Sequence, residues 1–153
     1  MAGYSGTPLP KKLGIVGDVV FVVTDPPDGF AETLGDYGEA VWQKSLLAPV
    51  DVVVAFFTSR SKLAAAWPKL TKPATLDGGV WVAWPKKTSG VPTDITEDVL
   101  REELLPTGWV DNKVCAIDDT WSGLRFVLRK ELRRPGDKRA AEISSFSPGG
   151  RPP

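Results

Sequence analysis

Short apolar runs rich in β-branched residues dominate the hydrophobic pattern. They cover 18–23 (DVVFVV), 50–57 (VDVVVAFF) and 80–84 (VWVAW). Runs of this length, bounded by Pro, Gly or Asp, are typical of strands covered on both faces. A closing hairpin is predicted from strands at 109–117 and 124–130, and the segment 39–44 favours one further short strand.

Helical patterns separate these strands. A short helix is predicted over 30–34, with Asp28 as its candidate cap and Gly35 at its end. An Ala-rich helix is predicted over 59–70, and Pro68 should bend or end it.

A third helix is predicted to start at Thr93 or Asp94, because either side chain could cap it, and to end at the Pro-Thr-Gly of 106–108. Asp77-Gly78-Gly79 is predicted to be a turn into the strand at 80–84. The order of elements favours parallel pairing with right-handed crossovers. The predicted fold is a three-layer Rossmann-like α/β sandwich, with a mostly parallel sheet of five to six strands and a C-terminal antiparallel hairpin.

The ends of the chain differ from its middle in composition. Residues 1–12 carry Gly and Pro without periodicity and are predicted to be an N-terminal arm. Residues 13–132 are predicted to form a single domain. Residues 133–153 are rich in Pro and Gly with a basic excess, and are predicted to be a disordered tail.

Composition excludes several classes of protein. The chain has 153 residues, 19 Lys plus Arg against 19 Asp plus Glu, no histidine and one cysteine, Cys115. The lack of histidine excludes Ser-His-Asp, Cys-His and His-ligated metal mechanisms. The balanced charge gives no overall attraction to nucleic acid, so no nucleic-acid partner is expected. No apolar run approaches a bilayer span and no signal core is present, so a cytoplasmic protein without a membrane partner is predicted.

Several motifs are similar to known families. The strand VDVVVAFF, the segment LDGG at 76–79, the strand VWVAW and the hairpin from 108 resemble the C-terminal half of the sheet in class I methyltransferases. The opening AGYSGTPLPKKLGI, the loop WPKKTSG and the segments VDNKVCA and TWSGL resemble a bacterial domain-of-unknown-function family of small cytoplasmic proteins. The resemblance implies a truncated methyltransferase-like core and brings no established activity.

Two departures from methyltransferases concern the S-adenosylmethionine site that the resemblance implies. Methyltransferases follow the first strand with a glycine-rich turn, because glycine lets the backbone approach the cofactor. Here the turn TDPPDG at 24–29 has one glycine and two prolines. An acidic residue usually ends the second strand and binds the ribose, but EAVWQKS offers none at the predicted strand end. We expect a degenerate site, with no bound cofactor, no metal and no catalytic residues.

The loops at the carboxyl ends of the strands carry candidate ligand residues. Ligands of open α/β sheets bind at this edge, and helix N-termini there favour anions. Cations, hydroxyl donors and one flat aromatic ring suggest an anionic ligand, such as a nucleotide or phosphorylated metabolite. The alternative is solvated surface charge, helix-capping hydroxyls and a core tryptophan. The candidates are Asp25, Arg60, Lys62, Trp84, Lys86, Lys87, Thr88 and Ser89.

Other residue types favour structural roles. Asp25 and Asp28 could hold a metal or act as a base, but their Pro-rich setting favours turn and cap residues. Cys115 lies within a predicted strand and no histidine could activate it, which favours a buried, inert thiol. Six tryptophans could form a patch for a protein partner, although packing between sheet and helices should account for at least four.

Two function hypotheses follow. The first is a noncatalytic binding or regulatory module that has kept a methyltransferase-like fold with a degenerate S-adenosylmethionine site. The alternative is an enzyme or sensor that binds a small anion in the cationic pocket at the strand ends. The expected partners are an anionic small molecule and a protein or a second copy of the chain. The arm and the basic tail are weaker candidates for docking segments.

Overall fold

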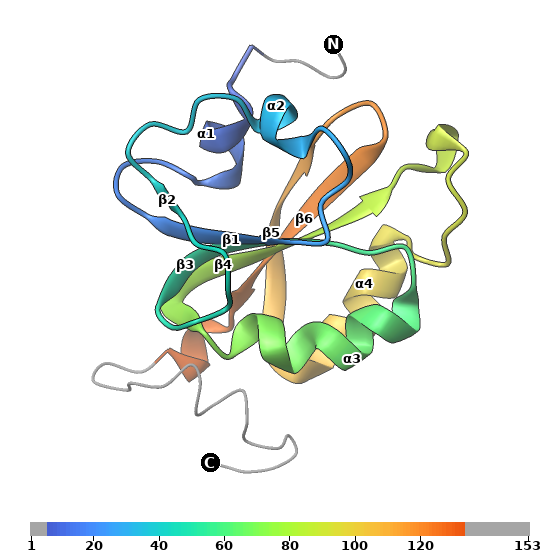
Figure 1. The fold of residues 1–153 in the computed structure, drawn as a ribbon. Coiled ribbons are helices and arrows are strands. Elements are labelled where there is room, and N and C mark those ends of the chain that lie inside the picture. Colours follow the sequence, from blue (N-terminus) through green and yellow to red (C-terminus); the bar gives the residue numbers. More distant parts are fainter. Residues whose placement is uncertain (1–5, 134–153) are drawn as a thin grey trace.

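A six-stranded mixed sheet forms the centre of the protein. The structure is a computed structural model that describes residues 6–133. The strand order is β2-β1-β3-β4-β6-β5 (Figure 1). The strands are β1 (Val20–Thr24), β2 (Val41–Trp42), β3 (Val50–Phe56), β4 (Ala74–Pro85), β5 (Trp109–Ala116) and β6 (Trp121–Leu128).

The direction of the strands confirms the predicted fold class. β2, β1, β3 and β4 pair in parallel, whereas β6 is antiparallel to both β4 and β5. The β5–β6 hairpin therefore closes the sheet, and β5 runs in the same direction as β4. The carboxyl ends of β1, β3, β4 and β5 consequently lie at one edge of the sheet.

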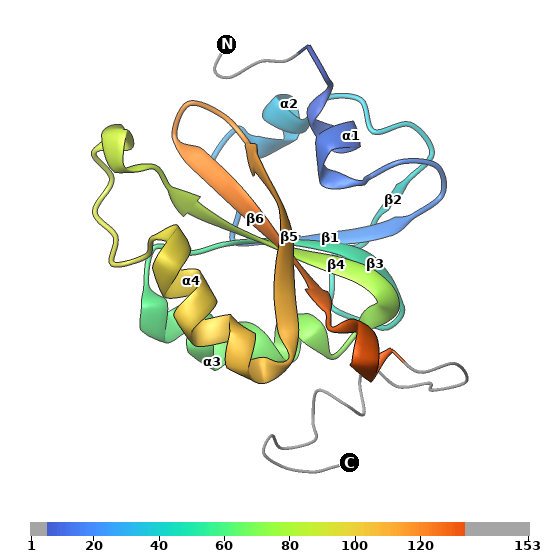
Figure 2. The same cartoon turned by 180° about the vertical axis from the view of Figure 1, so that it is seen from behind.

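Helices cover both faces of the sheet. α1 (Leu9–Leu13) and α2 (Phe30–Leu34) lie over one face, and α3 (Arg60–Thr71) and α4 (Glu97–Leu104) lie over the other (Figures 1 and 2). Three short 3-10 helices, η1 (Lys87–Ser89), η2 (Leu105–Thr107) and η3 (Lys130–Leu132), complete the described elements. Each face has its own apolar cluster, with Leu63 and Leu100 in one and Leu13 and Phe30 in the other.

Tryptophans fill both layers, as the sequence predicts. Trp67, Trp81, Trp84 and Trp109 are buried. Trp81 belongs to the cluster under α1 and α2, and Trp84 to the cluster under α3 and α4. Three positions separate them on one strand, so they point to opposite faces. Trp42 is half-buried and packs against other rings.

The predicted turn at 77–79 is wrong, because these residues lie inside β4. The register against β3 passes from Val50–Ala74 to Val52–Gly79, so β4 bulges between these pairs. A Cβ on Gly78 would lie 2.9 Å from the Asp51 carbonyl oxygen. The glycine therefore permits close approach of two strands, a role that glycine also has in β-bulges.

Helix starts also differ from the prediction. α4 begins at Glu97 and its cap is Thr96, whose hydroxyl accepts from the Val99 amide, so Thr93 and Asp94 do not cap it. α2 follows Gly29 without a side-chain cap, so Asp28 does not cap that helix. The capping hydroxyl of α4 therefore lies two or three residues further along than the sequence pattern suggested.

α3 continues through Pro68 to Thr71 and does not end after Trp67. Ser59 caps its first turn by accepting from the Lys62 amide. Pro68 removes one backbone donor, but burial of Leu63, Trp67 and Leu70 holds the helix on the sheet.

The predicted N-terminal arm includes part of α1. Leu9–Leu13 forms a helix in which Pro10 and Leu13 are buried, and Gly14 ends it in the left-handed conformation with a φ of 81°. Residues 1–5 of that arm, and all of the predicted tail except Arg133, lie outside the described residues.

Candidate functional site

The loops after β3 and β4 meet at the carboxyl edge of the sheet. The Thr93 hydroxyl donates to the Thr58 carbonyl over 2.7 Å. The Asp94 carboxylate accepts from the Arg60 amide, also over 2.7 Å. The structure thus brings these two loops together, and Asp94 lies at the N-terminus of α3. A carboxylate of the chain itself therefore already satisfies a donor that would attract an anion there.

Arg60 is held by α4. Its guanidinium donates to Glu103 at 2.5 Å and to Glu102 at 3.1 Å. The hydrogen bond to Glu103 is the largest cause that raises the pKa of Arg60. The sequence prediction missed this arrangement, because the two glutamates lie more than forty residues further along the chain.

The lysines of this edge lie apart from carboxylates. Lys62 and Lys87 are exposed and Lys86 is half-buried. None of the three has an ion-pair partner among residues 6–133.

Hydroxyls near Lys86 have local structural roles. Ser89 donates to the Lys86 carbonyl at 2.7 Å and accepts from the Val91 amide at 3.1 Å. The exposed Thr88 lies in η1 and has no side-chain hydrogen bond within the described chain. Trp84 is 8% exposed and packs in the core beneath α3 and α4.

The turn after β1 is unusual in its backbone and side chains. Asp25 has a φ of 52°, in the left-handed region that residues other than glycine rarely adopt. The Thr24 hydroxyl oxygen is buried and has no hydrogen-bond partner among the described residues. Asp25 and Asp28 are exposed, and Pro26 and Pro27 between them have no amide hydrogen.

Polar groups after β2 are engaged locally. The Gln43 side-chain amide donates to the carbonyls of Ser45 at 2.7 Å and Leu47 at 2.9 Å. The amide side chain is therefore fixed against its own loop.

Aromatic rings join the start of α2 to the ends of β2 and β3. Phe30, at the start of α2, contacts Trp42 and Phe56 edge-to-face, with ring centroids 6.2 and 5.2 Å apart. Phe56 in turn contacts Trp121, the first residue of β6, at 5.1 Å. Such contacts stabilise beyond the area they bury and hold the strand ends together.

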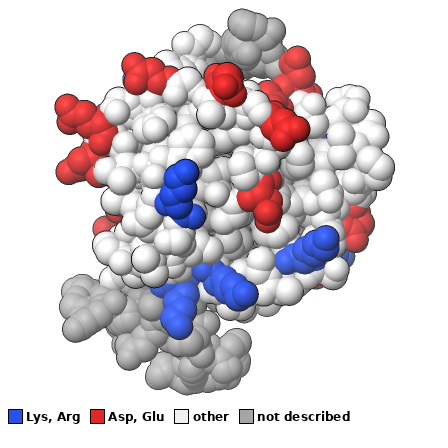
Figure 3. Space-filling view, viewed as in Figure 1, with Lys and Arg blue, Asp and Glu red and all other residues white. Residues whose placement is uncertain are grey.

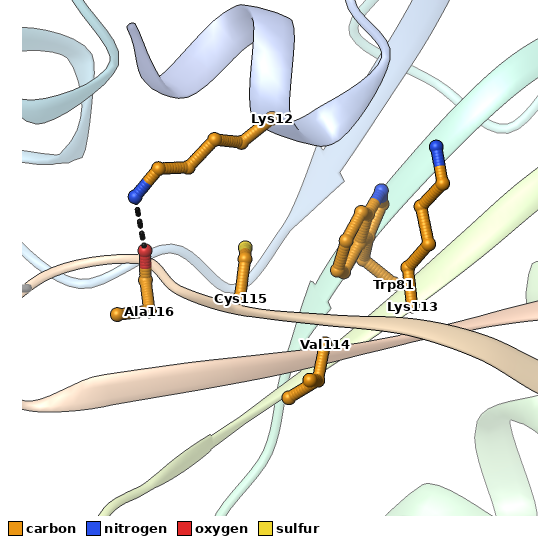
Figure 4. Close-up of a pocket in the computed structure, with 6 residues that line it drawn as sticks. All are labelled: Lys12, Trp81, Lys113, Val114, Cys115 and Ala116. Carbon is orange, nitrogen blue, oxygen red and sulfur yellow. Dashed lines mark hydrogen bonds between the residues drawn. The ribbon is translucent and has the colours of Figure 1, made fainter. Parts of the chain in front are cut away.

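A shallow hollow of about 490 Å³ lies beside β5, away from the predicted loops. Lys12, Lys113 and Cys115 line it together with Trp81, Val114 and Ala116 (Figure 4). Lys12 donates to the Ala116 carbonyl at 3.4 Å. Figure 4 shows Lys113, Cys115 and Trp81 on the α1 side of the strand and Val114 on the other side.

Cys115 is half-buried at this hollow. Burial raises the pKa of its thiol to about 11, although the charge of Lys12 opposes the shift. The thiol is therefore largely protonated at neutral pH and is a weak nucleophile. The sequence favours a buried, inert thiol, and the side chain is half-buried.

Charge is unevenly distributed along the chain. Between residues 13 and 43 there are six acidic residues and no Lys or Arg. All six are exposed. In Figure 3 acidic side chains predominate over the upper part of the molecule, where α1 and α2 lie, and basic ones are seen mostly lower down. The acids are Asp18, Asp25, Asp28, Glu32, Asp36 and Glu39.

Solved structures share this architecture. No family model matches the chain, and no curated protein matches it by sequence. A protein of Sulfolobus solfataricus assigned to the type 11 methyltransferases is similar with a TM-score of 0.54 and 10% identity, over 80% of this chain and 90% of the other. A TehB-like S-adenosylmethionine-dependent methyltransferase from Corynebacterium glutamicum gives 0.51 and 12%, over 84% and 91%.

A third similar structure is an S-adenosylmethionine-dependent methyltransferase from Aquifex aeolicus, with a TM-score of 0.50 and 14% identity, over 76% of this chain and 85% of the other. The fold is that of class I methyltransferases. The predicted methyltransferase-like core is therefore confirmed. At these identities the likeness concerns the fold alone.

Two kinds of feature are absent from residues 6–133. None of the helices there is long and apolar enough to span a membrane. No group of three or more ligand-type side chains in this range could hold a metal ion.

Proposed function

We propose that the protein is a noncatalytic binding or regulatory module on a methyltransferase-like fold whose S-adenosylmethionine site is degenerate. The contact between Phe30 and Trp42, with ring centroids 6.2 Å apart, carries this proposal. Phe30 begins the helix after β1, and Trp42 ends β2. Methyltransferases hold their cofactor between the turn after the first strand and the end of the second. Here two aromatic side chains of the chain itself bridge those elements.

The turn after β1 supports the same proposal. Pro26 and Pro27 supply no backbone donors, and Gly29 is the one glycine among residues 24–29. Asp25 and Asp28 place two exposed carboxylates where the cofactor's own carboxylate would approach. Like charges repel at short range, so this turn disfavours the methionyl group.

The end of β2 lacks the group that would bind a ribose. Gln43 and Lys44 follow Trp42, in place of an acidic residue. The Gln43 side-chain amide donates to two carbonyls of its own loop. Binding of a ribose hydroxyl by this side chain would leave those carbonyls without their donor, which costs free energy.

The chemistry of the remaining residues supports a noncatalytic role. The chain contains no histidine, and the pKa of its single cysteine is raised to about 11. The usual activated nucleophiles therefore lack a partner base. A single cysteine suits a reducing compartment, which, with the resemblance to a bacterial cytoplasmic family, supports a cytoplasmic location.

The alternative function is an enzyme or sensor for a small anion at Arg60, Lys86 and Lys87. Glu102 and Glu103 already neutralise Arg60, and Asp94 caps the adjacent helix N-terminus. These carboxylates oppose an anion at this edge and favour the first proposal. Binding of a nucleotide that a Lys86→Ala, Lys87→Ala double variant abolishes would support the alternative.

A protein partner or a second copy of the chain fits the β2 edge of the sheet. β2 has two residues and pairs on one side with β1. Val41 is 52% exposed on this strand and Leu47 is 67% exposed beyond it. Apolar side chains beside an open sheet edge favour association. Sedimentation equilibrium of the wild type and of Val41→Asp tests self-association there.

Titration of the full chain with S-adenosylmethionine and S-adenosylhomocysteine tests the degenerate site. A ligand at a hundred times its dissociation constant adds about 2.7 kcal/mol, or a melting shift of about 5 to 10 °C in a domain of this size. We expect no shift with either compound at millimolar concentration, while an active methyltransferase measured in parallel shifts. Micromolar binding by calorimetry would overturn the proposal.

A further inference from the structure

Three cations gather on one face of the β4–β6–β5 part of the sheet. Lys113 of β5 lies directly opposite Arg125 of β6, and Arg125 lies opposite Trp81 of β4. Directly opposite residues of an antiparallel pair share a face, and their Cβ atoms lie about 5 Å apart. Lys113 points to the α1 side with Trp81 (Figure 4). Arg125 therefore lies on the same side, next to Lys113.

Arg133 brings a third positive charge to Arg125. Burial lowers the pKa of Arg125, and the charge of Arg133 lowers it further. Arg133 directly follows η3, whose last residue, Leu132, packs closely on Gly108: a Cβ on Gly108 would lie 2.8 Å from the Leu132 Cδ1. The Arg133 side chain is 27% exposed, yet its Nε is buried without a hydrogen-bond partner among the described residues.

Carboxylates contribute little in direct contact with these three cations. Asp77 lies 3.8 Å from Arg133 and is 95% exposed, so the solvent-screened pair is weak. Arg125 has a single weak acceptor, the Asn112 side-chain oxygen at 3.4 Å. Lys113 has no ion-pair partner within residues 6–133.

Two other arginines of the fold, Arg101 and Arg60, are held by carboxylates. Arg101 bonds Asp111 at 3.1 Å and Glu97 at 2.8 Å, and these hydrogen bonds raise its pKa. Arg60 is likewise held by two glutamates. Like charges opposite each other on a sheet are destabilising, and a half-buried guanidinium needs acceptors. The described residues therefore give Lys113, Arg125 and Arg133 no strong oxyanion partner, and an oxyanion from a ligand would compensate their charge.

The backbone leaves room for a close approach at this cluster. The Arg125 guanidinium lies against Gly79 of β4, and a Cβ there would be 2.7 Å from its Cζ and 2.8 Å from its Nη2. The missing side chain at Gly79 lets the guanidinium rest on the sheet. The hollow of about 490 Å³ begins at Lys113 and extends past Cys115 towards Lys12.

We propose that Lys113, Arg125 and Arg133 bind the phosphate groups of a small anionic molecule, whose remaining part lies in the hollow beside Cys115. A planar guanidinium group can donate two parallel hydrogen bonds to two oxygens of one phosphate, and the Lys113 ammonium adds a point charge. The hollow lies within the size range of small-molecule sites, about 300 to 1,000 Å³. Ala116 and the half-buried Cys115 line it and suit an apolar part, while Trp81, 1% exposed, lies beneath them.

This site is separate from the cofactor position of the methyltransferase fold. Gly79 lies in the first half of β4 and Arg125 in the second half of β6, both away from the carboxyl ends of the parallel strands. The hollow reaches Ala116 at the end of β5, which is the edge strand on the opposite side of the sheet from β2. The outcome of the S-adenosylmethionine titration therefore does not decide the phosphate site, and failure of either proposal leaves the other intact.

The test is calorimetric titration of the full chain with inorganic pyrophosphate at low and moderate salt. We expect measurable binding that weakens about tenfold or more in Arg133→Gln, because a charge-assisted hydrogen bond is lost. The affinity of Arg133→Lys should fall between those of the wild type and Arg133→Gln, because lysine keeps the charge but loses the planar set of donors of the guanidinium. Lys130→Gln, which removes an exposed cation three residues away, should bind like the wild type.

Further variants distinguish this site from the lysines after β4 and from a nucleic-acid surface. Lys113→Gln should weaken binding as Arg133→Gln does, which keeps the test valid if Arg125→Gln fails to fold. No binding at millimolar pyrophosphate would overturn the proposal, and so would binding that is lost in the Lys86→Ala, Lys87→Ala variant and kept in Arg133→Gln. A single-stranded oligonucleotide that binds more tightly than pyrophosphate through these cations would identify a nucleic-acid surface and overturn the small-molecule assignment.

Discussion

Trp81→Phe tests how the centre of the sheet holds α1. The Trp81 indole nitrogen donates to the Leu13 carbonyl at 2.9 Å, and both residues are almost completely buried. Leu13 ends α1, and the last carbonyls of a helix lack partners within it. The indole thus satisfies a carbonyl that water does not reach. Phenylalanine keeps a ring at the site but has no donor.

The expected cost has two parts. The smaller ring buries about 40 Å² less apolar surface, which is about 1 kcal/mol. A buried carbonyl without its donor costs about 1 to 3 kcal/mol more. The free energy of unfolding should fall by about 2 to 4 kcal/mol in total, and the melting temperature by about 5 to 15 °C.

Trp67→Phe is the matched control. Trp67 is 3% exposed and donates to the Thr107 hydroxyl at 3.0 Å, but Thr107 itself is exposed. Water can replace the lost donor there, so Trp67→Phe should cost only the apolar part, about 1 kcal/mol. Guanidinium denaturation followed by circular dichroism gives both values. Costs equal within about 0.5 kcal/mol, or a larger cost for Trp67→Phe, would refute the role assigned to the Leu13 carbonyl.

Three further predictions concern other parts of the structure. Burial raises the pKa of the Cys115 thiol from 9.0 to about 11, so the unfolded chain loses this proton at a lower pH than the folded chain does. The free energy of unfolding should therefore fall as the pH rises from 9.0 to about 11, and Cys115→Ala should lack this part of the fall. Asp94→Ala removes the acceptor of the Arg60 amide and should cost about 1 kcal/mol in denaturant titrations, whereas Asp98→Ala, with an 88% exposed side chain, should cost less. Gly78→Ala places a Cβ 2.9 Å from the backbone carbonyl oxygen of Asp51 and should cost about 1 to 3 kcal/mol in denaturant titrations, whereas Gly79→Ala meets only the far end of the Arg125 side chain and should cost less; equal costs would contradict these contacts.

The central strands were predictable because their burial is complete. Val53, Val54 and Ala55 are 0% exposed, so the run of apolar residues in the sequence reflects cover on both faces. The hairpin was predictable because its turn residues lie between two consecutive strands. The Rossmann-like order followed from the alternation of strand and helix patterns.

Elements decided by distant contacts could not be predicted from local pattern. Asp77-Gly78-Gly79 has the composition of a turn, and it is the proximity of Asp51 on β3 that keeps it inside β4. The same limit applies to the candidate site. The sequence around Arg60 is typical of an anion-binding cation. The structure pairs it with Glu102 and Glu103, which lie on a helix more than forty residues later and neutralise its charge.

The cations without strong partners were hidden for a similar reason. Arg125 lies in an apolar strand segment, LRFVL, where a lone polar residue suggests only that this face is open. Its position opposite Lys113 depends on the hairpin register, which a bulge between Asp111 and Lys113 shifts by one residue. Without that bulge Lys113 would point to the other face, because successive residues of a strand alternate.

The bulge also explains why Asp111 and Lys113 point to opposite sides of β5. Asp111, before it, points to the helix side and bonds Arg101 of α4, which fixes that helix on the sheet. Lys113, after the bulge, points to the α1 side, so Asp111 on the helix side cannot pair with it. An acid and a base two positions apart on a regular strand would share one face and could neutralise each other. The extra residue, Asn112, separates them, gives Arg125 its single weak acceptor and leaves positive charge on the side of the sheet that holds the hollow.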